Sequence, residues 1–236
     1  MKVRELGEFG LIDLLARKVA GSPGQSPAPD RLIIGIGDDT AAWQSDAAIE
    51  LATVDSLVEN VHFSLETATW RELGWKSLAI NLSDIAAMGG VPGYALVALN
   101  LPEDTEVEDV AALYDGLLDL ANRTSTAIAG GNISGSPVVS ITVTVIGSSR
   151  GGKLLRRSTA RPGDVIAVTG QLGTAAAGLE MLTKKLTFEP EVTEYLRDAF
   201  LQPVPRLDEG RVLVENGITT AIDISDGLAA DLRHIC

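Results

Sequence analysis

The sequence predicts a mixed α/β fold in two units, in which strands and helices alternate along the chain. The clearest strand is residues 139–145, where Val and Ile alternate with Ser and Thr. The clearest helix runs from about residue 70 to Met88. It begins with the capping-box pattern Thr69 to Glu72, and two glycines end it. With 236 residues, 45% of them hydrophobic and 22% charged, the chain is long and apolar enough to bury a core.

The first unit is expected to span residues 1–148. A helix at about residues 8–20 precedes a loop rich in Pro, Gly and Ser. A second capping-box pattern, Thr105 to Glu108, predicts the start of another helix. Together with the helix and strand above, the remaining expected elements are strands at 32–36, 48–54 and 94–101.

The second unit is expected to span residues 149–236. A glycine-rich break at 147–152 and a turn at 161–164 separate it from the first. Because only 88 residues remain and the last helix is still running at Cys236, we expect this unit to be incomplete. Its predicted elements are strands at 165–169 and 219–224, with helices at about 174–184, 192–200, 206–216 and from 226.

Composition excludes several classes of protein. Lys and Arg number 19 and Asp and Glu 32, a formal net charge of −13. Such a surface repels nucleic acids and anionic membranes, so neither is expected as a partner. The single cysteine, Cys236, excludes an internal disulfide framework and a multi-cysteine zinc site. No apolar run is long enough to span a membrane or to resemble a secretory signal, so the expected location is the cytoplasm.

Aspartates gather at the ends of the predicted strands. In α/β proteins these ends carry binding sites, and carboxylates that converge repel one another unless a cation lies between them. Mg²⁺ prefers such oxygen ligands and would let an acidic protein bind a phosphorylated substrate. The alternative is that Gly-Asp-Asp and Ser-Asp-Gly simply form turns and helix caps. The aspartates are Asp38, Asp39, Asp55, Asp223 and Asp226, with Asp84 inside the apolar helix.

Four other segments could contact a ligand, each with an ordinary structural alternative. Gly130 and Gly131 permit close backbone approach and Asn132 offers a metal ligand, or the segment is a plain turn. Arg156 and Arg157 could grip phosphate, or lie in a solvated turn. His62 could contact an anion or be structural. The segment 147–154 resembles a P-loop in form, but Leu154 replaces the Ser or Thr that binds Mg²⁺, so no P-loop is expected.

Taken together, these segments resemble the thiamine-monophosphate kinase family, within the superfamily of aminoimidazole ribonucleotide synthetase-like proteins. The resemblance covers nearly the whole chain, and the order and spacing of the segments make it specific. It rests on residues 7–12 (GEFGLI), 35–39 (GIGDD), 53–63 (TVDSLVENVHF), 76–89 (KSLAINLSDIAAMG), 130–134 (GGNIS), 157–164 (RSTARPGD) and 222–228 (IDISDGL).

The resemblance implies a function and a set of site residues. The implied reaction is direct, Mg²⁺-assisted phosphoryl transfer from ATP to thiamine monophosphate, the last step of thiamine diphosphate biosynthesis. It implies several Mg²⁺ ions and a homodimer that pairs its N-terminal sheets. The implied metal positions are Asp39, Thr53, Val54, Asp55, Asp84, Asn132, Asp223 and Asp226; the ATP contacts are Tyr114, Gly131, Asn132, Arg157 and Ser225; the thiamine phosphate contact is His62.

Two departures from the family pattern leave alternatives open. Position 132, often Asp in the family, is Asn here, which removes one negative charge from the expected metal site. The family continues beyond the position matching Cys236, and that continuation carries part of the thiamine pocket. The alternatives are a non-catalytic module that binds Mg-nucleotide and dimerises, and a superfamily enzyme with another acceptor. The residues themselves favour phosphoryl transfer, because no nucleophile-and-base arrangement is present and this chemistry needs none.

Overall fold

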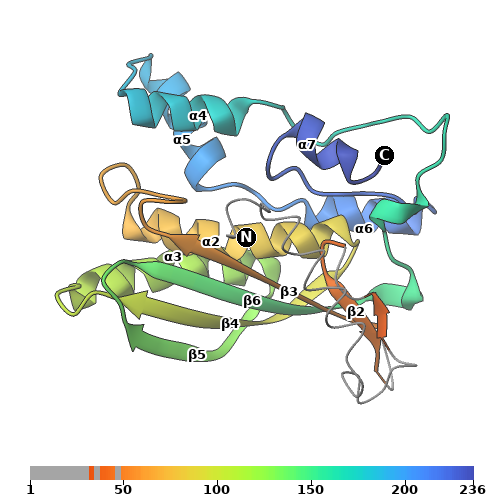
Figure 1. Cartoon of the computed structure of the whole chain (residues 1–236), viewed down its shortest axis with the longest axis horizontal. Helices are drawn as coiled ribbons and strands as arrows, with labels where there is room; N and C mark the ends of the chain where they lie inside the picture. Colours follow the sequence, from red (N-terminus) through yellow and green to blue (C-terminus); the bar gives the residue numbers. More distant parts are fainter. Residues whose placement is uncertain (1–31, 35–37, 46–48) are drawn as a thin grey trace, which may run out of the picture.

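A computed structural model describes residues 32–34, 38–45 and 49–236. The helix expected at 8–20 lies outside these residues. A six-stranded sheet in the order β1-β2-β3-β6-β4-β5 forms the base of the fold (Figure 1). Its strands are β1 (Leu32–Ile34), β2 (Ala41–Gln44), β3 (Ile49–Val58), β4 (Val91–Leu101), β5 (Ala127–Gly135) and β6 (Ser140–Ser149).

The sheet is mixed, and its centre is its most regular part. β3 pairs antiparallel with β6 along its full length, from Ile49 opposite Ser149 to Val58 opposite Ser140. β4 pairs antiparallel with β6 on the other side and parallel with the edge strand β5. The predicted alternation in β6 is confirmed, because Ile141, Val143 and Val145 are fully buried.

Helices cover one face of this sheet in two layers. α2 (Trp70–Ala87) and α3 (Val107–Thr124) lie directly on the sheet, and the later helices lie above α2 (Figure 1). Two short 3₁₀ turns, at Arg150–Gly152 and Arg157–Thr159, lead from the sheet to the upper layer. The upper helices are α4 (Thr174–Lys184), α5 (Pro190–Leu201), α6 (Leu207–Glu215) and α7 (Leu228–Arg233).

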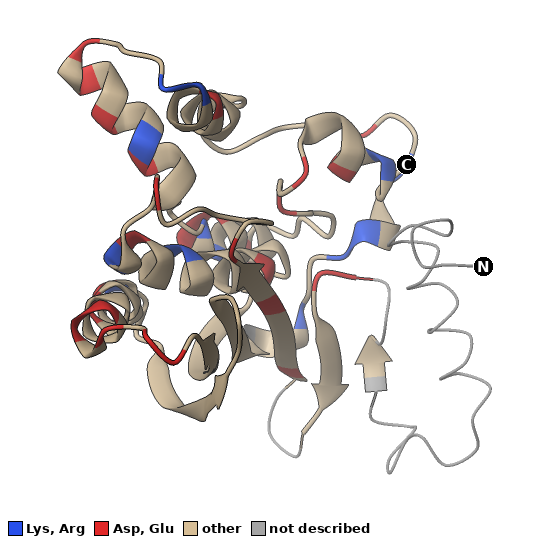
Figure 2. Cartoon of the chain, turned by 60° about the vertical axis from the view of Figure 1, so that its left-hand side comes forward, with Lys and Arg blue, Asp and Glu red and all other residues tan. Residues whose placement is uncertain are grey.

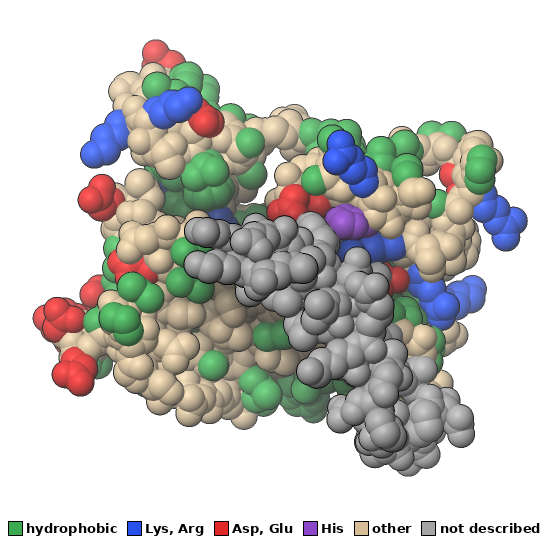
Figure 3. All heavy atoms as spheres, in the orientation of Figure 1, with side chains coloured by type: hydrophobic (Ala, Val, Ile, Leu, Met, Phe, Trp, Pro, Cys, Tyr) green, Lys and Arg blue, Asp and Glu red, His purple; other side chains and the backbone are tan. Residues whose placement is uncertain are grey.

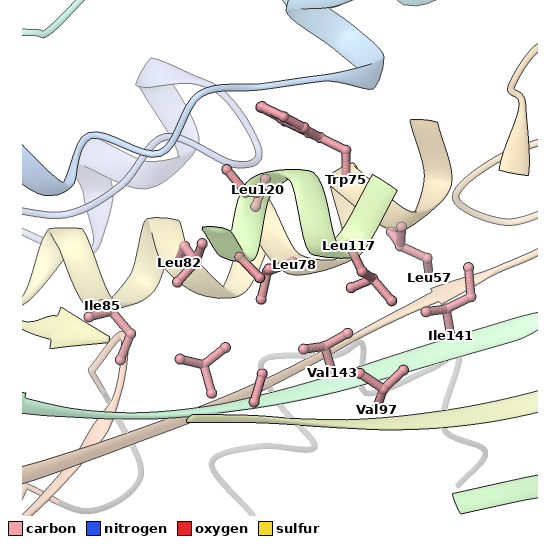
Figure 4. Close-up of a cluster of buried hydrophobic side chains, with 14 of the residues drawn as sticks. Leu57, Trp75, Leu78, Leu82, Ile85, Val97, Leu117, Leu120, Ile141 and Val143 are labelled. Carbon is pink, nitrogen blue, oxygen red and sulfur yellow. The ribbon is translucent and has the colours of Figure 1, made fainter. Parts of the chain in front are cut away.

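The main core lies between the sheet and the α2–α3 pair. Leu78 and Leu82 of α2 and Leu117 of α3 point toward Val97 and Val143 of the sheet (Figure 4). All five side chains are almost completely buried. Burying a side chain of this size contributes roughly 1.5–3 kcal/mol, so this layer fixes α2 on the sheet and with it the position of Asp84.

Glycines allow the two lower helices to touch backbone to backbone. A Cβ on Gly74 of α2 would lie 1.9 Å from the carbonyl oxygen of Leu113, and one on Gly116 of α3 would lie 1.8 Å from that of Arg71. Neither position has room for a larger residue. The pair of glycines therefore sets the close spacing of α2 and α3.

The start of α2 is confirmed, whereas the predicted start of α3 is wrong. Thr69 and Glu72 form the complete capping box that the sequence predicts. α3 begins one residue after Glu106, which makes no side-chain cap, so Thr105 does not serve as the cap residue. Asp109 and Glu108 in the first turn still stabilise the helix N-terminus through its dipole.

Two predicted strands are wrong and two real strands were not expected. Residues 165–169 and 219–224 form no regular secondary structure and pair with none of the described strands. Val165 and Ile166 are 92% and 63% exposed, and hydrophobic side chains reach the surface along this part of the chain (Figure 3). A strand needs a neighbouring strand to share its backbone hydrogen bonds. The β-forming residues of these two segments are therefore not enough, by themselves, to make them strands.

The unexpected strands are β2 and β5. β2 is only four residues long, and β5 contains the Gly130–Ser134 segment that was expected to be either a ligand loop or a turn. Nearly every β5 residue is exposed, so the usual apolar alternation is missing from its sequence.

Among the helices described here, none is long and apolar enough to cross a membrane.

Candidate functional site

Three aspartates from distant parts of the chain meet above the sheet. One carboxylate oxygen each of Asp39, Asp84 and Asp223 lies within 4.8 Å of the others. Asp39 precedes β2, Asp84 lies near the end of α2, and Asp223 lies in the loop before α7. Acidic positions on a strand of the sheet and on the loop leading to the C-terminal helix appear in Figure 2. The sequence predicted all three residues as metal ligands, and the fold brings them together.

Hydrogen bonds hold each carboxylate in place. Thr53 of β3 donates its hydroxyl to Oδ2 of Asp84. Ser83, the residue before Asp84, donates its hydroxyl to Oδ2 of Asp223 over 2.9 Å. α2 therefore contacts the sheet through Asp84 and the loop before α7 through Ser83.

The carboxylates are in an environment that disfavours their negative charge. Burial raises the pKa of Asp84 to about 8, the Thr53 hydrogen bond opposes that rise, and the negative charges of Asp223, Asp55 and Asp39 add to it. Burial, followed by the charge of Asp39, raises the pKa of Asp223 to about 6. The pKa of Asp39 is raised too, mainly by burial, against the opposing effect of Arg157.

Arg157 supplies the positive charge that lies closest to this cluster. Its guanidinium Nη2 is paired with Oδ1 of Asp39, and its Nε lies 3.7 Å from Oδ1 of Asp38. The side chain of Arg157 is 23% exposed and that of Asp39 is 1% exposed. One arginine thus faces the carboxylates of Asp38, Asp39 and Asp223, so the site retains an excess of acidic groups.

The donor set fits a hard divalent cation. Oδ2 of Asp39 is buried and has no hydrogen-bond partner within the described part of the chain. An oriented carboxylate oxygen without a partner is costly unless a cation or a proton binds it. Three carboxylates, with the Thr53 hydroxyl beside them, match the oxygen ligands of Mg²⁺, which keeps several waters and needs few protein ligands.

Of the other predicted metal residues, Asp55 lies close enough to Asp84 for its charge to act on it, whereas Asp226 and Val54 are not part of the three-aspartate cluster. Asp55 is exposed, and it follows Thr53 by two positions on β3, so both side chains lie on the face that α2 covers. Asp226 is exposed in the loop before α7. Val54 points to the opposite face of the sheet and is 59% exposed, so only its backbone carbonyl could take part in binding.

A hollow lies at the edge of the sheet, beside β5. It has a volume of about 570 Å³ and is lined by Tyr114 of α3 and by residues 128–133 of β5. Three predicted ATP contacts, Tyr114, Gly131 and Asn132, therefore share one surface. A Cβ on Gly131 would lie 1.8 Å from the carbonyl oxygen of Val97, so glycine is required there by the pairing with β4.

The remaining predicted residues are exposed and do not join this hollow. Ser225 lies in the loop before α7, two residues after Asp223, and its amide donates a hydrogen bond to Asp231. His62 lies in the turn after β3, where its Nδ1 accepts a hydrogen bond from the Val58 amide over 3.0 Å. That bond leaves Nε2 of His62 as the ring nitrogen available to a ligand.

Reasoning from sequence missed two residues that shape the site. Ser83 is a neighbour of Asp84 within the same sequence segment, so its closeness to the cluster was foreseeable but its partner was not. Asp231 is 4% exposed and accepts hydrogen bonds from the amides of Ser225 and Gly227. The only sequence signal for it was that a further aspartate follows Asp223 and Asp226 at short spacing.

The 147–154 segment forms a strand end and a 3₁₀ turn with no following α-helix, which confirms that it is not a P-loop.

The fold and the aspartate cluster together define a class of protein. Residues 37–149 match the family model described as AIR synthase related protein, N-terminal domain. Hydrogenase maturation proteins described as HypE share the fold at lower similarity: one solved HypE–HypF complex has a TM-score of 0.55 and 18% identity, and the match covers 74% of this chain and 55% of that one.

More similar proteins narrow this class to one family. The thiamine-monophosphate kinase of Aquifex aeolicus is 37% identical over 236 residues, which is all of this chain and 72% of that protein. The one from Bacillus subtilis is 37% identical over 206 residues, 86% of this chain and 63% of its own length. A solved structure described as AaThiL complexed with AMPPCP and TMP has a TM-score of 0.88 and 37% identity over 100% of this chain and 71% of that chain. The chain belongs to the thiamine-monophosphate kinase family, and it spans about two thirds of the length of these relatives.

Proposed function

We propose that this protein transfers the terminal phosphoryl group of ATP directly to thiamine monophosphate, giving thiamine diphosphate and ADP. The observation that carries the proposal is the meeting of Asp39, Asp84 and Asp223, together with the buried Oδ2 of Asp39, which has no described hydrogen-bond partner. Two relatives named thiamine-monophosphate kinase, and a similar structure described with AMPPCP and TMP, support the choice of substrates.

The aspartates would hold Mg²⁺. Bound there, Mg²⁺ neutralises phosphate oxygens and brings donor and acceptor phosphates together despite their charge. Asp39, Asp84 and Asp223 supply the ligands, while Thr53 orients Asp84 and Ser83 orients Asp223. Asp55 and Asp226 would supply ligands for further ions, and the amide oxygen of Asn132 would add a neutral ligand.

The nucleotide would extend from this cluster to the hollow beside β5. The aromatic ring of Tyr114 and the open backbone at Gly131 suit an adenosine group, and Arg157 and Ser225 suit its phosphates. His62 would contact the acceptor phosphate through Nε2. That phosphate oxygen is already deprotonated near neutral pH, so the protein needs no general base to activate it.

The proposal includes a homodimer in the cytoplasm. The face of the sheet that no described helix covers carries Val54, Tyr94 and Leu96, each between 42% and 59% exposed. These side chains form an apolar surface of the kind that a second sheet would bury. The relatives named thiamine-monophosphate kinase support a cytoplasmic site of action, because a biosynthetic kinase acts where ATP is available.

The experiment is a product assay on the full chain. The protein is incubated with ATP, Mg²⁺ and thiamine monophosphate, and thiamine diphosphate is measured by fluorescence after oxidation to thiochrome. We expect product that disappears with EDTA and in Asp84→Asn. Asp208→Asn is the matched control, because Asp208 is an exposed aspartate on α6 paired only with its own helix in the described structure.

The outcomes separate the proposal from its alternatives. Turnover of a different phosphate acceptor, with none of thiamine monophosphate, assigns another superfamily reaction. Binding of Mg-ATP without any product assigns a nucleotide-binding module. Product formation that survives EDTA contradicts the assignment of the aspartates.

A further inference from the structure

A fourth aspartate, Asp231, lies beneath the loop that precedes α7. It is 4% exposed, although it is ionisable and lies on a short, otherwise open helix. Its Oδ2 accepts hydrogen bonds from the backbone amides of Ser225 and Gly227, each over 3.0 Å. The carboxylate thus binds the amides of Ser225 and Gly227, in the turn before α7, to α7 itself.

This turn carries the predicted ligands of the site. Asp223, Ser225 and Asp226 all lie within five residues, in a stretch that belongs to no strand. Its beginning is attached elsewhere, through Thr159 to Thr220 and through Ser83 to Asp223. Asp231 holds the end of the turn, so the orientation of the residues at 225 and 226 depends on it.

The backbone makes this attachment necessary. Gly227 precedes α7 with φ 116° and ψ 150°, a conformation that side chains rarely adopt, and it has no side chain to cap the helix. Asp231, in the first turn of α7, accepts from the amide of Gly227 itself and from that of Ser225, so the residues before the helix are bound to it through this one carboxylate. Charge-assisted hydrogen bonds of this kind are stronger than neutral ones and fix the turn more tightly.

The position of Asp231 has an electrostatic cost. Its negative charge contributes to raising the pKa of both Asp39 and Asp223, because it adds to a cluster that is already too negative. An asparagine would accept the same hydrogen bonds without that charge. A carboxylate here is therefore better suited to a site that also holds cations.

We propose that Asp231 is a positioning residue for the Mg-nucleotide: its carboxylate fixes the backbone at 225–227 so that Ser225 and Asp226 face the phosphates and the ions beside Asp223. This inference rests on the proposed function, because it takes the nucleotide site from there. It assigns no contact between Asp231 and the substrates. Its effect is transmitted through the two amides.

The test compares Asp231→Ala and Asp231→Asn with Asp208→Ala, which removes an exposed charge from α6. Amide hydrogen exchange at Ser225 and Gly227 is measured by NMR on the unliganded chain, and Mg-ATP affinity by calorimetry. For Asp231→Ala we expect exchange at both amides to speed up and the Kd for Mg-ATP to rise about tenfold, as two charge-assisted hydrogen bonds are lost. The KM for thiamine monophosphate should stay within about twofold, because this acceptor is bound elsewhere.

If the Asp231→Ala variant fails to fold, the same two measurements are made on Asp231→Asn. Asp231→Asn keeps an acceptor oxygen for both amides but loses the charge that strengthens the two bonds, so we expect partial loss of amide protection and a rise in Kd of about two- to fivefold. Lost protection with unchanged Kd in either variant overturns the inference, and so does an equal loss in Asp208→Ala. If the wild-type chain binds Mg-ATP but makes no thiamine diphosphate, the kinase assignment fails while the exchange and binding results still decide the role of Asp231.

Discussion

The hydroxyl of Ser83 donates to Oδ2 of Asp223 over 2.9 Å, although the two residues are 140 positions apart. Ser83 lies on α2, which packs on the sheet, and Asp223 lies in the loop of the upper layer. The neighbouring residue, Asp84, contacts Thr53 of β3. Two consecutive residues of one helix therefore connect the sheet and the upper loop at the point where the aspartates meet.

We expect Ser83→Ala to weaken this connection without unfolding the protein. Losing one hydrogen bond to a charged acceptor costs about 1.5–3 kcal/mol when the acceptor stays buried. Because Asp223 would then lose its only described donor, the expected result is a lower affinity for Mg²⁺ in titrations followed by thermal shift. Ser83→Thr, which keeps the hydroxyl, should retain most of the affinity. Equal affinity in Ser83→Ala and wild type would contradict this role.

Removing a carboxylate from the cluster should stabilise the metal-free protein and abolish its response to Mg²⁺. Asp84 is a buried acid surrounded by Asp223, Asp55 and Asp39, so its charge is unfavourable in the absence of a cation. Asp84→Asn keeps an acceptor for Thr53. We expect a higher Tm than wild type in EDTA, and little or no rise when Mg²⁺ is added, measured by calorimetry at pH 8.

Asp115→Asn is the control for that experiment. Asp115 is on α3, its side chain is 63% exposed, and its ion pair with Arg71 is long at 3.8 Å. Exposed pairs of this kind contribute little, so the Tm should change by less than a degree or so and the Mg²⁺ response should remain. A destabilised Asp84→Asn in EDTA would show that the cluster is not strained by repulsion.

Close backbone contact between α2 and α3 predicts a strong effect at Gly116. A Cβ there would overlap the carbonyl group of Arg71, so Gly116→Ala must push the helices apart. We expect a loss of about 1–3 kcal/mol in the free energy of unfolding, measured in urea. Gly151→Ala is the comparison, because a Cβ there meets no atom within 4 Å, although its φ of 68° adds backbone strain. A smaller loss in Gly116→Ala than in Gly151→Ala would contradict the packing argument.

Much of the lower layer was predictable because its signals are local. The capping box of α2, the alternation of β6 and the placing of Asp84 in an apolar helix all rest on residues close in sequence. β5 was missed because an exposed, glycine-rich edge strand lacks alternation. Residues 165–169 and 219–224 were predicted as strands from their apolar residues, yet no described strand pairs with them.

The site was predictable as a set of residues but not as an arrangement. The aspartates stand at the ends of predicted elements, so their chemistry pointed to a cation. The resemblance to a family supplied Tyr114 and Ser225, which no local pattern distinguishes, and gave the paired glycine Gly131 its role as an ATP contact. Nothing in the sequence links Ser83 to Asp223 or Asp231 to the amide of Ser225, because those contacts depend on how the upper layer lies on α2.

Lys76 should make the stability of the protein depend on pH in the alkaline range. Its ammonium lies 3.5 Å from the centroid of the Phe200 ring, between α2 and α5, and burial lowers its pKa to about 8. In the unfolded chain its pKa returns to the model-peptide range near 10.4. Between about pH 8 and pH 10 the unfolded chain therefore binds more protons than the folded one, so this group's contribution to the free energy of unfolding rises with pH.

The variant Lys76→Met tests whether the contribution of Lys76 to the free energy of unfolding rises with pH. Methionine fills similar space without a charge, so at pH 7, where the wild-type lysine is protonated and partly desolvated, the variant should be more stable by about 1 kcal/mol. The cation–π contact that is lost makes this gain smaller than the pKa shift alone implies. As the pH rises toward 10 the wild-type lysine becomes neutral in the folded state, and the difference should shrink. Lys184→Met, at a side chain that is 64% exposed, should show no such convergence in urea titrations across the same range. A constant difference between wild type and Lys76→Met from pH 7 to pH 10 would show that Lys76 keeps an ordinary pKa in the folded protein.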